Sequence, residues 1–368
     1  MIYQRYAVNP VTHRFFQTLL LPIVVSVTLS ISATAEHCMT QAERESDKAV
    51  AEAYELTFPA MGTMLAFQAF SHDEQQVERV FNQARDEVDR LVEILSDYST
   101  ESETVRLSEI EKIGQWQTPS PELWEVLEVC DRWHQLSSGA FDASVGRLSQ
   151  LWRKARKSKT IPTQTEIDTA LRLCGWQHVQ LDRAGHRVKL SLAGIKLDFG
   201  AMGKGYIIDK AYERLADGGL PCALVRAGGD LRCGDAPPDR PGWPIEIAKL
   251  SDKETPQQLF LANAAISSSG DLYQFLEVDG VRRSHVLDPR TGLGVPGPRL
   301  VTVIAATATE ADAADTALCV MSDKAALKVA ERLGEIHVRL ATLAKDGDQE
   351  SMIVHTTTEF GKRFTVSR

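Results

Sequence analysis

The sequence has no excess of positive charge, no internal repeat and no low-complexity tract. Its 368 residues hold 41 lysines and arginines against 50 aspartates and glutamates, which gives a formal net charge of −9. An acidic chain without a basic face binds duplex nucleic acid poorly, so nucleic acid is excluded as its partner. Because 43% of the residues are hydrophobic, the chain can bury a large core, and disordered and fibrous classes are excluded as well.

Motifs of several common enzyme classes are missing. No Gly-x-Gly-x-x-Gly follows a predicted strand, and the sequence has neither a Walker A loop nor a Gly-x-Ser-x-Gly elbow. The six cysteines include no Cys-x-x-Cys pair, which argues against a zinc ribbon or a thioredoxin-type centre. Cys222 and Cys233 either pair across a hairpin or stay buried as free thiols.

The first 35 residues have the pattern of a secretory signal peptide. Two arginines precede an apolar stretch over residues 19–31, and an Ala-x-Ala sequence ends at Ala35. This stretch is shorter than the roughly 20 residues that a membrane-spanning helix needs. We therefore predict a signal peptide over residues 1–35, a flexible leader over 36–52 and one domain over 53–368, in an exported, periplasmic protein. The alternatives are an uncleaved anchor in the inner membrane and a lipid anchor at Cys38, which lacks the usual small apolar residues before it.

Predicted strands and helices alternate irregularly along the domain. Helical spacing predicts helices over 73–95, 121–139, 204–216, 310–321 and 324–333, the first with a capping box of Ser71 and Glu74. Alternating apolar residues predict strands over 54–58, 63–70, 178–182, 187–191, 195–199, 223–226 and 300–305. The order predicts an α+β fold with largely antiparallel sheet, and not a doubly wound nucleotide fold. We interpret the basic run over 153–159 as a solvated helix end and loop.

The segment over residues 196–209 passes from a predicted strand through a turn of small residues into a helix. Such a helix start presents backbone N–H groups to an anion, and Lys204 in its first turn adds a positive charge. The pattern favours a phosphate-bearing ligand. The alternative is that the glycines only permit tight packing.

Three further segments carry candidate chemistry. On a helix, Asp312 and Thr316 stand at i and i+4 and offer hard oxygen ligands, which suit Mg²⁺ better than Zn²⁺. The alternative is that the acidic residues of this segment only complement the dipole at the start of the helix. In the turn over residues 284–292, His285 is a candidate general base or phosphate contact, while Asp288 and Arg290 are expected to fix the turn. In the segment over 138–142, a glycine permits close approach of a ligand whose ring Phe141 contacts.

Taken together, these segments resemble the FAD:protein FMN transferases, the ApbE family. The resemblance covers residues 54–365 and depends on the order of its motifs, which are Ala60-Met61-Gly62-Thr63, Leu95-Ser96-Asp97-Tyr98, Gly139-Ala140-Phe141-Asp142, the run 198–209, Gly228-Gly229-Asp230, Ser268-Ser269-Gly270-Asp271, the run 285–292 and the run 311–317.

The resemblance implies roles for particular residues. Met61 and Tyr98 match the side chains that sandwich the isoalloxazine ring of FAD, and further FAD-binding positions fall on Ala140, Phe141, Asp142, Asp198, Lys204 and Val286. The magnesium ligands fall on Asp312, Thr316 and the main-chain oxygen of Ala201, with Asp315 beside them. His285 and Asp288 are the candidate proton acceptors.

The resemblance also implies a reaction and a partner. The family moves the FMN half of FAD onto a Ser or Thr hydroxyl of another protein as a phosphodiester, with Mg²⁺, and releases AMP. The acceptor is expected to be an exported or membrane subunit of a redox complex, and its motif ends in Ser-Gly-Ala-Thr. In this chain Phe141 stands where the acceptor threonine of that motif belongs, so modification of the chain by itself there is excluded. The alternatives are an FAD pyrophosphatase that makes FMN and AMP, and a non-catalytic exported flavin-binding protein.

Overall fold

The computed structural model describes residues 4–6, 51–251, 254–271, 275–278, 281–346 and 349–363. The cleavage position after Ala35 and Cys38 lie outside these residues. Of the predicted signal peptide only residues 4–6, which form strand β1, are described, and of the predicted leader only residues 51 and 52. In the described part of the chain, no helix is both long and apolar enough to cross a membrane.

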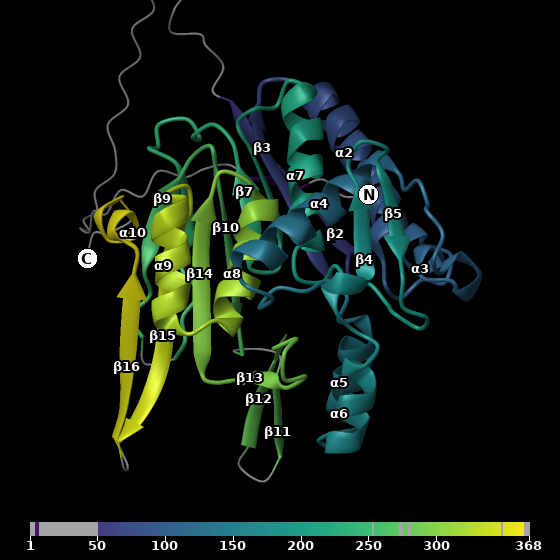
Figure 1. The fold of residues 1–368 in the computed structure, drawn as a ribbon. Coiled ribbons are helices and arrows are strands. Elements are labelled where there is room, and N and C mark those ends of the chain that lie inside the picture. Colours follow the sequence, from purple (N-terminus) through teal and green to yellow (C-terminus); the bar gives the residue numbers. More distant parts are fainter. Residues whose placement is uncertain are drawn as a thin grey trace, which may run out of the picture.

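A nine-stranded antiparallel sheet forms the centre of the domain (Figure 1). Its strands run in the order β1-β2-β3-β6-β7-β10-β14-β15-β16, and neighbours such as β2 and β3 pair in continuous register from Glu52 opposite Ser71 to Ala60 opposite Thr63. The prediction of an α+β fold with largely antiparallel sheet is confirmed. The strands are β1 (Gln4–Tyr6), β2 (Glu52–Ala60), β3 (Thr63–Ser71), β6 (Ala223–Ala227), β7 (Asp230–Cys233), β10 (Ala264–Gly270), β14 (Arg299–Ala305), β15 (His337–Asp346) and β16 (Gln349–Thr356).

Three small antiparallel sheets surround this centre. They pair β4 (Val179–Asp182) with β5 (Arg187–Leu190), β8 (Trp243–Glu246) with β9 (Gln258–Leu261), and β12 (Val281–Leu287) with both β11 (Phe275–Val278) and β13 (Gly294–Pro296). The predicted strand over 195–199 is not formed, because Lys196 makes only an isolated bridge to Val145. That segment instead leads into a turn before the next helix.

Helices cover one face of the central sheet and pack beside it. They are α2 (Glu74–Leu95), α3 (Glu103–Leu107), α4 (Pro121–Leu136), α5 (Gly146–Ser158), α6 (Gln164–Leu171), α7 (Gly203–Asp217), α8 (Ala308–Val320), α9 (Asp323–Leu333) and α10 (Thr358–Arg363), with short 3₁₀ turns at Ile110–Lys112 and Trp176–His178. Helix α7 contacts both α2 and α8, while α8 lies against β10 and β14. These contacts bring the two helices with candidate site residues together.

Alternation along β6 separates two hydrophobic clusters. Val225 and Ala227 belong to the large core beneath the helices, whereas Leu224 belongs to a smaller cluster on the other face with Trp243 of β8. Neighbouring residues of a strand point to opposite faces, so each strand contributes to both clusters. The sheet therefore has one face covered by helices and a second face that the β8–β9 pair covers only in part.

Helix starts agree with the sequence in most cases. Ser120 caps α4 by accepting a hydrogen bond from the Leu123 N–H at 3.2 Å. At α2 the predicted cap is wrong by two residues: Asp73 Oδ1 accepts from the Gln76 N–H at 3.0 Å, and Ser71 Oγ accepts from the Asp73 N–H at 3.1 Å. The strand β3 extends to Ser71, which moves the cap to the next suitable side chain.

The cysteines within the described residues are free thiols, including Cys222 and Cys233. The Cys222 thiol contacts the Ala236 carbonyl and the Cys233 thiol contacts the Ala264 carbonyl, each at 3.4 Å. Burial raises the pKa of both thiols to about 11. Of the two alternatives for this pair, the structure shows the unpaired one.

Candidate functional site

A cavity of about 430 Å³ collects most of the predicted site residues from distant parts of the chain. Asp288 and Asp315 are absent from its wall, whereas the remaining candidates line it: Met61, Tyr98, Ala140, Phe141, Asp142, Asp198, Ala201, Lys204, His285, Val286, Asp312 and Thr316. A second hollow of about 560 Å³ is larger but contains none of these candidates. The chemistry that the sequence predicts therefore belongs to the smaller cavity.

The start of α7 connects this cavity to helix α8. The Gly205 N–H donates to Asp312 Oδ2 at 2.9 Å, so this amide is bonded within the protein and is not offered to an anion. A Cβ atom added at Gly205 would lie 2.2 Å from the Ala308 carbonyl oxygen, which is closer than any real contact. The glycine thus serves the close packing of α7 on α8, while the positive charge of Lys204 remains at the cavity wall.

Buried carboxylates gather behind Lys204. Its ammonium group forms an ion pair with Asp230 and lies 3.7 Å from Asp312 Oδ1. Ser267 Oγ joins Asp230 Oδ1 at 2.5 Å to Asp315 Oδ2 at 2.6 Å. Because these carboxylates outnumber the single ammonium group beside them, the cluster carries excess negative charge next to the cavity.

Burial and mutual repulsion change the ionisation of this cluster. Burial raises the pKa of Asp312 to about 6, Lys204 opposes that rise, and Asp230 adds to it. Burial and the charge of Asp312 raise the pKa of Asp315 well above its ordinary value. Burial acts to lower the pKa of Lys204, but Asp312 and Asp230 outweigh it and raise that pKa. Opposite charges hold the lysine protonated.

The oxygen atoms of α8 that reach the cavity come from Asp312 and Thr316. Thr316 Oγ1 lies 3.2 Å from Ser269 Oγ on β10 and donates to Asp315 Oδ1 at 3.3 Å. Asp315 itself is fully buried below the wall. The described residues contain no group of three or more His, Cys, Asp or Glu side chains around one metal position. A cation here needs oxygens of other kinds, from a hydroxyl, a carbonyl, water or a ligand.

Two side chains from separate loops form another part of the wall. Met61 occupies the left-handed region at φ 51° in the two-residue turn between β2 and β3, beside Gly62 at φ 72°. These angles fit a type I′ turn, in which a methionine is strained, and strain of this kind is concentrated at functional sites. Tyr98 lines the same cavity, and its side chain is 77% exposed.

Helix α5 supplies two arginines that the sequence interpretation missed. The Arg153 guanidinium lies 4.4 Å from the centre of the Tyr98 ring and pairs with Asp97 Oδ2 at 2.5 Å and Asp198 Oδ2 at 2.6 Å. Arg156 also lines the cavity, where burial and the charge of Arg153 lower its pKa. The interpretation of the run 153–159 as solvated is thus wrong for these two residues.

The spacing along α5 explains this correction. Ser149, Arg153 and Arg156 follow one another at four and three residues, so they share the face of α5 that meets the cavity. Lys154 and Lys157 lie on the exposed face. Trp152 and Ala155, which are buried, stand next to Arg153 and Arg156 in the sequence. Their spacing could have predicted a helix whose two arginines border its buried face.

The loop at Ala140-Phe141-Asp142 is held by internal hydrogen bonds. Asp142 Oδ1 accepts from the Ser144 N–H at 2.7 Å, and Oδ2 accepts from the Trp176 N–H at 3.0 Å. The Phe141 ring is buried, and its carbonyl oxygen lies 2.9 Å from His134 Nδ1. Asp142 thus orders the loop beside the cavity.

The turn after β12 separates the two candidate proton acceptors. His285 and Val286 lie on the cavity wall. Asp288 lies off it, where Arg290 Nε and Nη2 each donate to its carboxylate at 2.8 Å. The expectation that Asp288 and Arg290 fix this turn is confirmed. The structure brings His285, and not Asp288, to the cavity.

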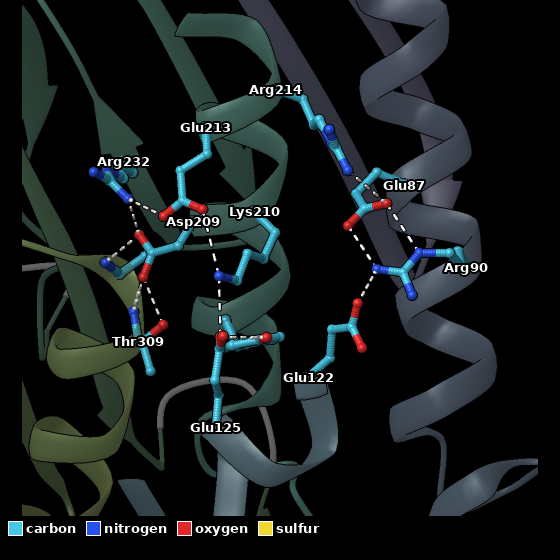
Figure 2. Close-up of polar contacts among 12 residues, drawn as sticks. Glu87, Arg90, Glu122, Glu125, Asp209, Lys210, Glu213, Arg214, Arg232 and Thr309 are labelled. Carbon is cyan, nitrogen blue, oxygen red and sulfur yellow. Dashed lines mark hydrogen bonds and ion pairs between the residues drawn. The ribbon is translucent and has the colours of Figure 1, made fainter. Parts of the chain in front are cut away.

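A polar network on the far side of α7 fixes the position of α8 (Figure 2). Asp209 accepts hydrogen bonds from the Ala308 and Thr309 N–H groups, each at 2.8 Å, and from Thr309 Oγ1 at 2.5 Å. Arg232 of β7 donates to the same carboxylate at 2.9 Å. Asp209 on α7 therefore binds the first N–H groups of α8, next to its N-cap residue Thr307. Thr309 lies three residues before the cavity residue Asp312.

Comparison with known proteins agrees with this geometry. The sequence model described as "ApbE family" matches residues 61–340. The chain belongs to the ApbE family. Its relatives include the FAD:protein FMN transferase of Salmonella typhimurium, 31% identical over 74% of this chain and 80% of the relative, and that of Escherichia coli K12, 31% identical over 70% and 74%.

Solved ApbE structures have the same fold. The apo flavinyl transferase ApbE of Pseudomonas stutzeri superposes with a TM-score of 0.76 at 27% identity, over 88% of this chain and all of that one. The ApbE protein of Thermotoga maritima gives a TM-score of 0.74 at 27% identity, over 85% and 99%. The described domain of this chain thus has the architecture of a whole ApbE protein.

Proposed function

We propose that this chain transfers the FMN half of FAD to a Ser or Thr hydroxyl of another protein, forming a phosphodiester and releasing AMP. The observation that carries the proposal is the single cavity that unites Met61 and Tyr98, the cations Lys204, Arg153 and Arg156, and the oxygens of Asp312 and Thr316. Family membership supports the same reaction, because the curated relatives are named for it.

The walls of the cavity suit the different parts of FAD. Met61 and Tyr98 flank the isoalloxazine ring, because a thioether and an exposed aromatic ring both contact π systems favourably. Lys204, Arg153 and Arg156 neutralise the diphosphate, since hydrogen bonds between cations and phosphate are about twice as strong as neutral ones. Asp198 keeps Arg153 in place through its ion pair at 2.6 Å.

The oxygen donors suit Mg²⁺. Asp312, Thr316 and the Ala201 carbonyl would hold the ion, with Asp315 beside them, and the negative surplus of the buried carboxylates supports a divalent cation there. Mg²⁺ commonly uses one or two carboxylates together with substrate phosphates and water, which fits the small number of carboxylates at the wall. Bound Mg²⁺ stabilises negative charge on phosphate oxygens and orients them.

The transfer step requires that a proton leave the acceptor hydroxyl. The hydroxyl oxygen forms a bond to the phosphorus of the FMN half, the bond from that phosphorus to the bridging oxygen breaks, and this oxygen leaves with AMP. His285 receives the hydroxyl proton because it lies on the cavity wall, whereas the Asp288 carboxylate is engaged by Arg290. The cations of the cavity stabilise the charge that develops on the leaving group.

An assay with acceptor protein, FAD and MgCl₂ tests this function. Intact-mass spectrometry should show the acceptor heavier by one FMN, and in-gel fluorescence should show it flavinylated. Asp312→Asn should lower the rate at least about 100-fold, as expected when a ligand of the charge-stabilising cation is lost. The control Glu335→Gln changes an exposed carboxylate after α9 and should stay within about twofold.

Two other outcomes would replace the proposal. Free FMN and AMP with an unmodified acceptor would identify an FAD pyrophosphatase. Tight FAD binding without any turnover, and with the same behaviour in Asp312→Asn, would identify a flavin-binding protein without catalysis.

We also propose that the chain is exported to the periplasm and acts there on a subunit of a redox complex. The pattern of residues 1–35 supports export. Cell fractionation and N-terminal sequencing of the purified protein test this: a new N-terminus after Ala35 in the periplasmic fraction supports export with cleavage, recovery of the intact chain with membranes supports the anchored alternative, and recovery from the cytoplasm would overturn it.

A further inference from the structure

The 560 Å³ hollow lies on the sheet face opposite the helices. Its floor is formed by Leu224, Leu231 and Ile266, which belong to the hydrophobic cluster of that face. Its far end is closed by Phe70 and Trp243, whose ring centres are 5.7 Å apart. We call this hollow the back trough. It has an apolar floor and polar walls, and no residue of the proposed reaction lies in it.

We call the 430 Å³ cavity that is proposed to bind FAD the FAD cavity. The back trough meets it at the tip of the β6–β7 hairpin. Gly228, Gly229 and Ser268 line both hollows. The two hollows therefore border each other at the exposed end of this hairpin. A Cβ atom added at Gly229 would have nothing within 4 Å. The tip is therefore a low rim without side chains between the trough and the cavity.

The wall of the trough includes residues beside both ends of β6. Its far end lies at Phe70, whose N–H donates to the Cys222 carbonyl at 3.0 Å, and its near end lies at Gly228, six residues further along the chain. At roughly 3.3 Å per residue, this path is about 20 Å long. That length matches about six residues of extended polypeptide, and its apolar floor suits a segment with apolar side chains on one face.

We propose that the back trough binds an extended segment of the acceptor protein and leads its hydroxyl over the glycine rim into the FAD cavity. This inference depends on the proposed function, since it assigns the path of that reaction's second substrate. The residues that line both hollows favour an acceptor segment over an unrelated ligand, because a chain seated in the trough and leaving it past Gly228 and Gly229 arrives at the cavity. The tip glycines allow the polypeptide to pass without a steric barrier.

A bulky substitution inside the trough tests the inference. Gln68 lies on the trough wall, partly exposed, and is absent from the wall of the FAD cavity. Gln68→Trp should raise the KM for a recombinant acceptor domain that carries a Ser-Gly-Ala-Thr segment at least about tenfold, about 1.4 kcal/mol. The Kd for FAD should stay within about twofold. Glu335→Trp, at an exposed position after α9 and outside the trough, is the control and should leave both constants unchanged.

Photo-crosslinking gives a second measurement that does not require Gln68→Trp to fold. Benzoylphenylalanine at the exposed position Arg226 of the trough should capture the acceptor domain, and mass spectrometry should locate the bond beside its modified threonine. The same group at the exposed position Glu335, outside the trough, should capture none. Unchanged acceptor KM in folded Gln68→Trp, or equal capture at both positions, overturns the inference. Failure of the wild-type enzyme to modify any acceptor would instead overturn the proposed function.

Discussion

Asp209 provides the sharpest test of how the site is assembled. Its carboxylate is only 6% exposed and bonds two N–H groups at the start of α8, the Thr309 hydroxyl and the Arg232 guanidinium. Asp209→Ala removes all four partners at once. It changes no atom in the wall of the FAD cavity, so its effect on the cavity must pass through the position of α8.

The expected cost follows from the contacts that are lost. A helix N-cap contributes about 0.5–2 kcal/mol. Removing one partner of a buried ion pair costs about 3–5 kcal/mol. Arg232 has only 19% of its side chain exposed and loses its nearest carboxylate, at 2.9 Å, keeping only the half-exposed Glu213 at 3.6 Å. Since these effects involve the same carboxylate, they overlap, and we expect a loss of about 3–5 kcal/mol in the free energy of unfolding.

Urea denaturation of wild type, Asp209→Ala and Glu213→Ala measures this loss. Glu213 is the matched control because it also approaches Arg232, at 3.6 Å, but has 47% of its side chain exposed. An exposed ion pair contributes about 0–1 kcal/mol, so Glu213→Ala should lose less than about 1 kcal/mol. If Asp209→Ala loses no more than Glu213→Ala, Asp209 does not hold α8 in place and the reasoning is refuted.

Three further predictions concern the helices around the cavity. Gly205→Ala should lower the free energy of unfolding by about 1–3 kcal/mol through overpacking against Ala308. Gly203→Ala is the control and should not lower it, because its new Cβ would meet Phe199 Cβ at an ordinary 3.5 Å. Equal melting temperatures of the two variants would contradict the close packing of α7 on α8. Arg156→Ala should weaken FAD binding about tenfold, or about 1.4 kcal/mol, and the exposed neighbour Lys157 provides the control; fluorescence titration showing the same Kd for both variants would remove Arg156 from the ligand contacts. Arg153→Ala should weaken FAD binding at least as much, because Tyr98, Asp97 and Asp198 all lose their contact with the guanidinium. Arg153→Lys should restore little of the binding, since lysine cannot bridge both carboxylates. Full restoration by lysine would show that only the charge matters.

Local patterns in the sequence predicted most of the elements. The apolar spacing of α2 and the Ser-Pro start of α4 specify helices through contacts only a few residues apart. The predicted strand over 195–199 was wrong, because its apolar residues are buried by neighbouring helices and loops and not by strand pairing. The sequence predicted that those residues are buried, whereas their backbone conformation depends on the helices and loops that pack against them.

The candidate site was predicted as a set of residue types in an order along the chain. Met61, Asp198, Lys204, His285 and Asp312 all reach one cavity, as the resemblance implied. The roles of Arg153 and Arg156 were missed, because the charge of the run was weighed without the spacing of Trp152 and Ala155, which marks the buried face of this helix. The sequence gives the charge of each residue, but the packing of the helix decides whether that charge faces solvent or a cavity.

The sequence alone determined the chemistry available to this protein: the acids and hydroxyls of α8, the lysine at the start of α7 and the glycines that let chains approach each other. Tertiary structure decided which of these groups meet. It placed Asp312 on the cavity wall and Asp315 beneath it, and His285 inside the cavity and Asp288 outside it. The physical reason is that spacing along the chain limits which side chains share one face of a helix, but only the packing of distant helices and strands fixes which of those side chains reach a shared cavity.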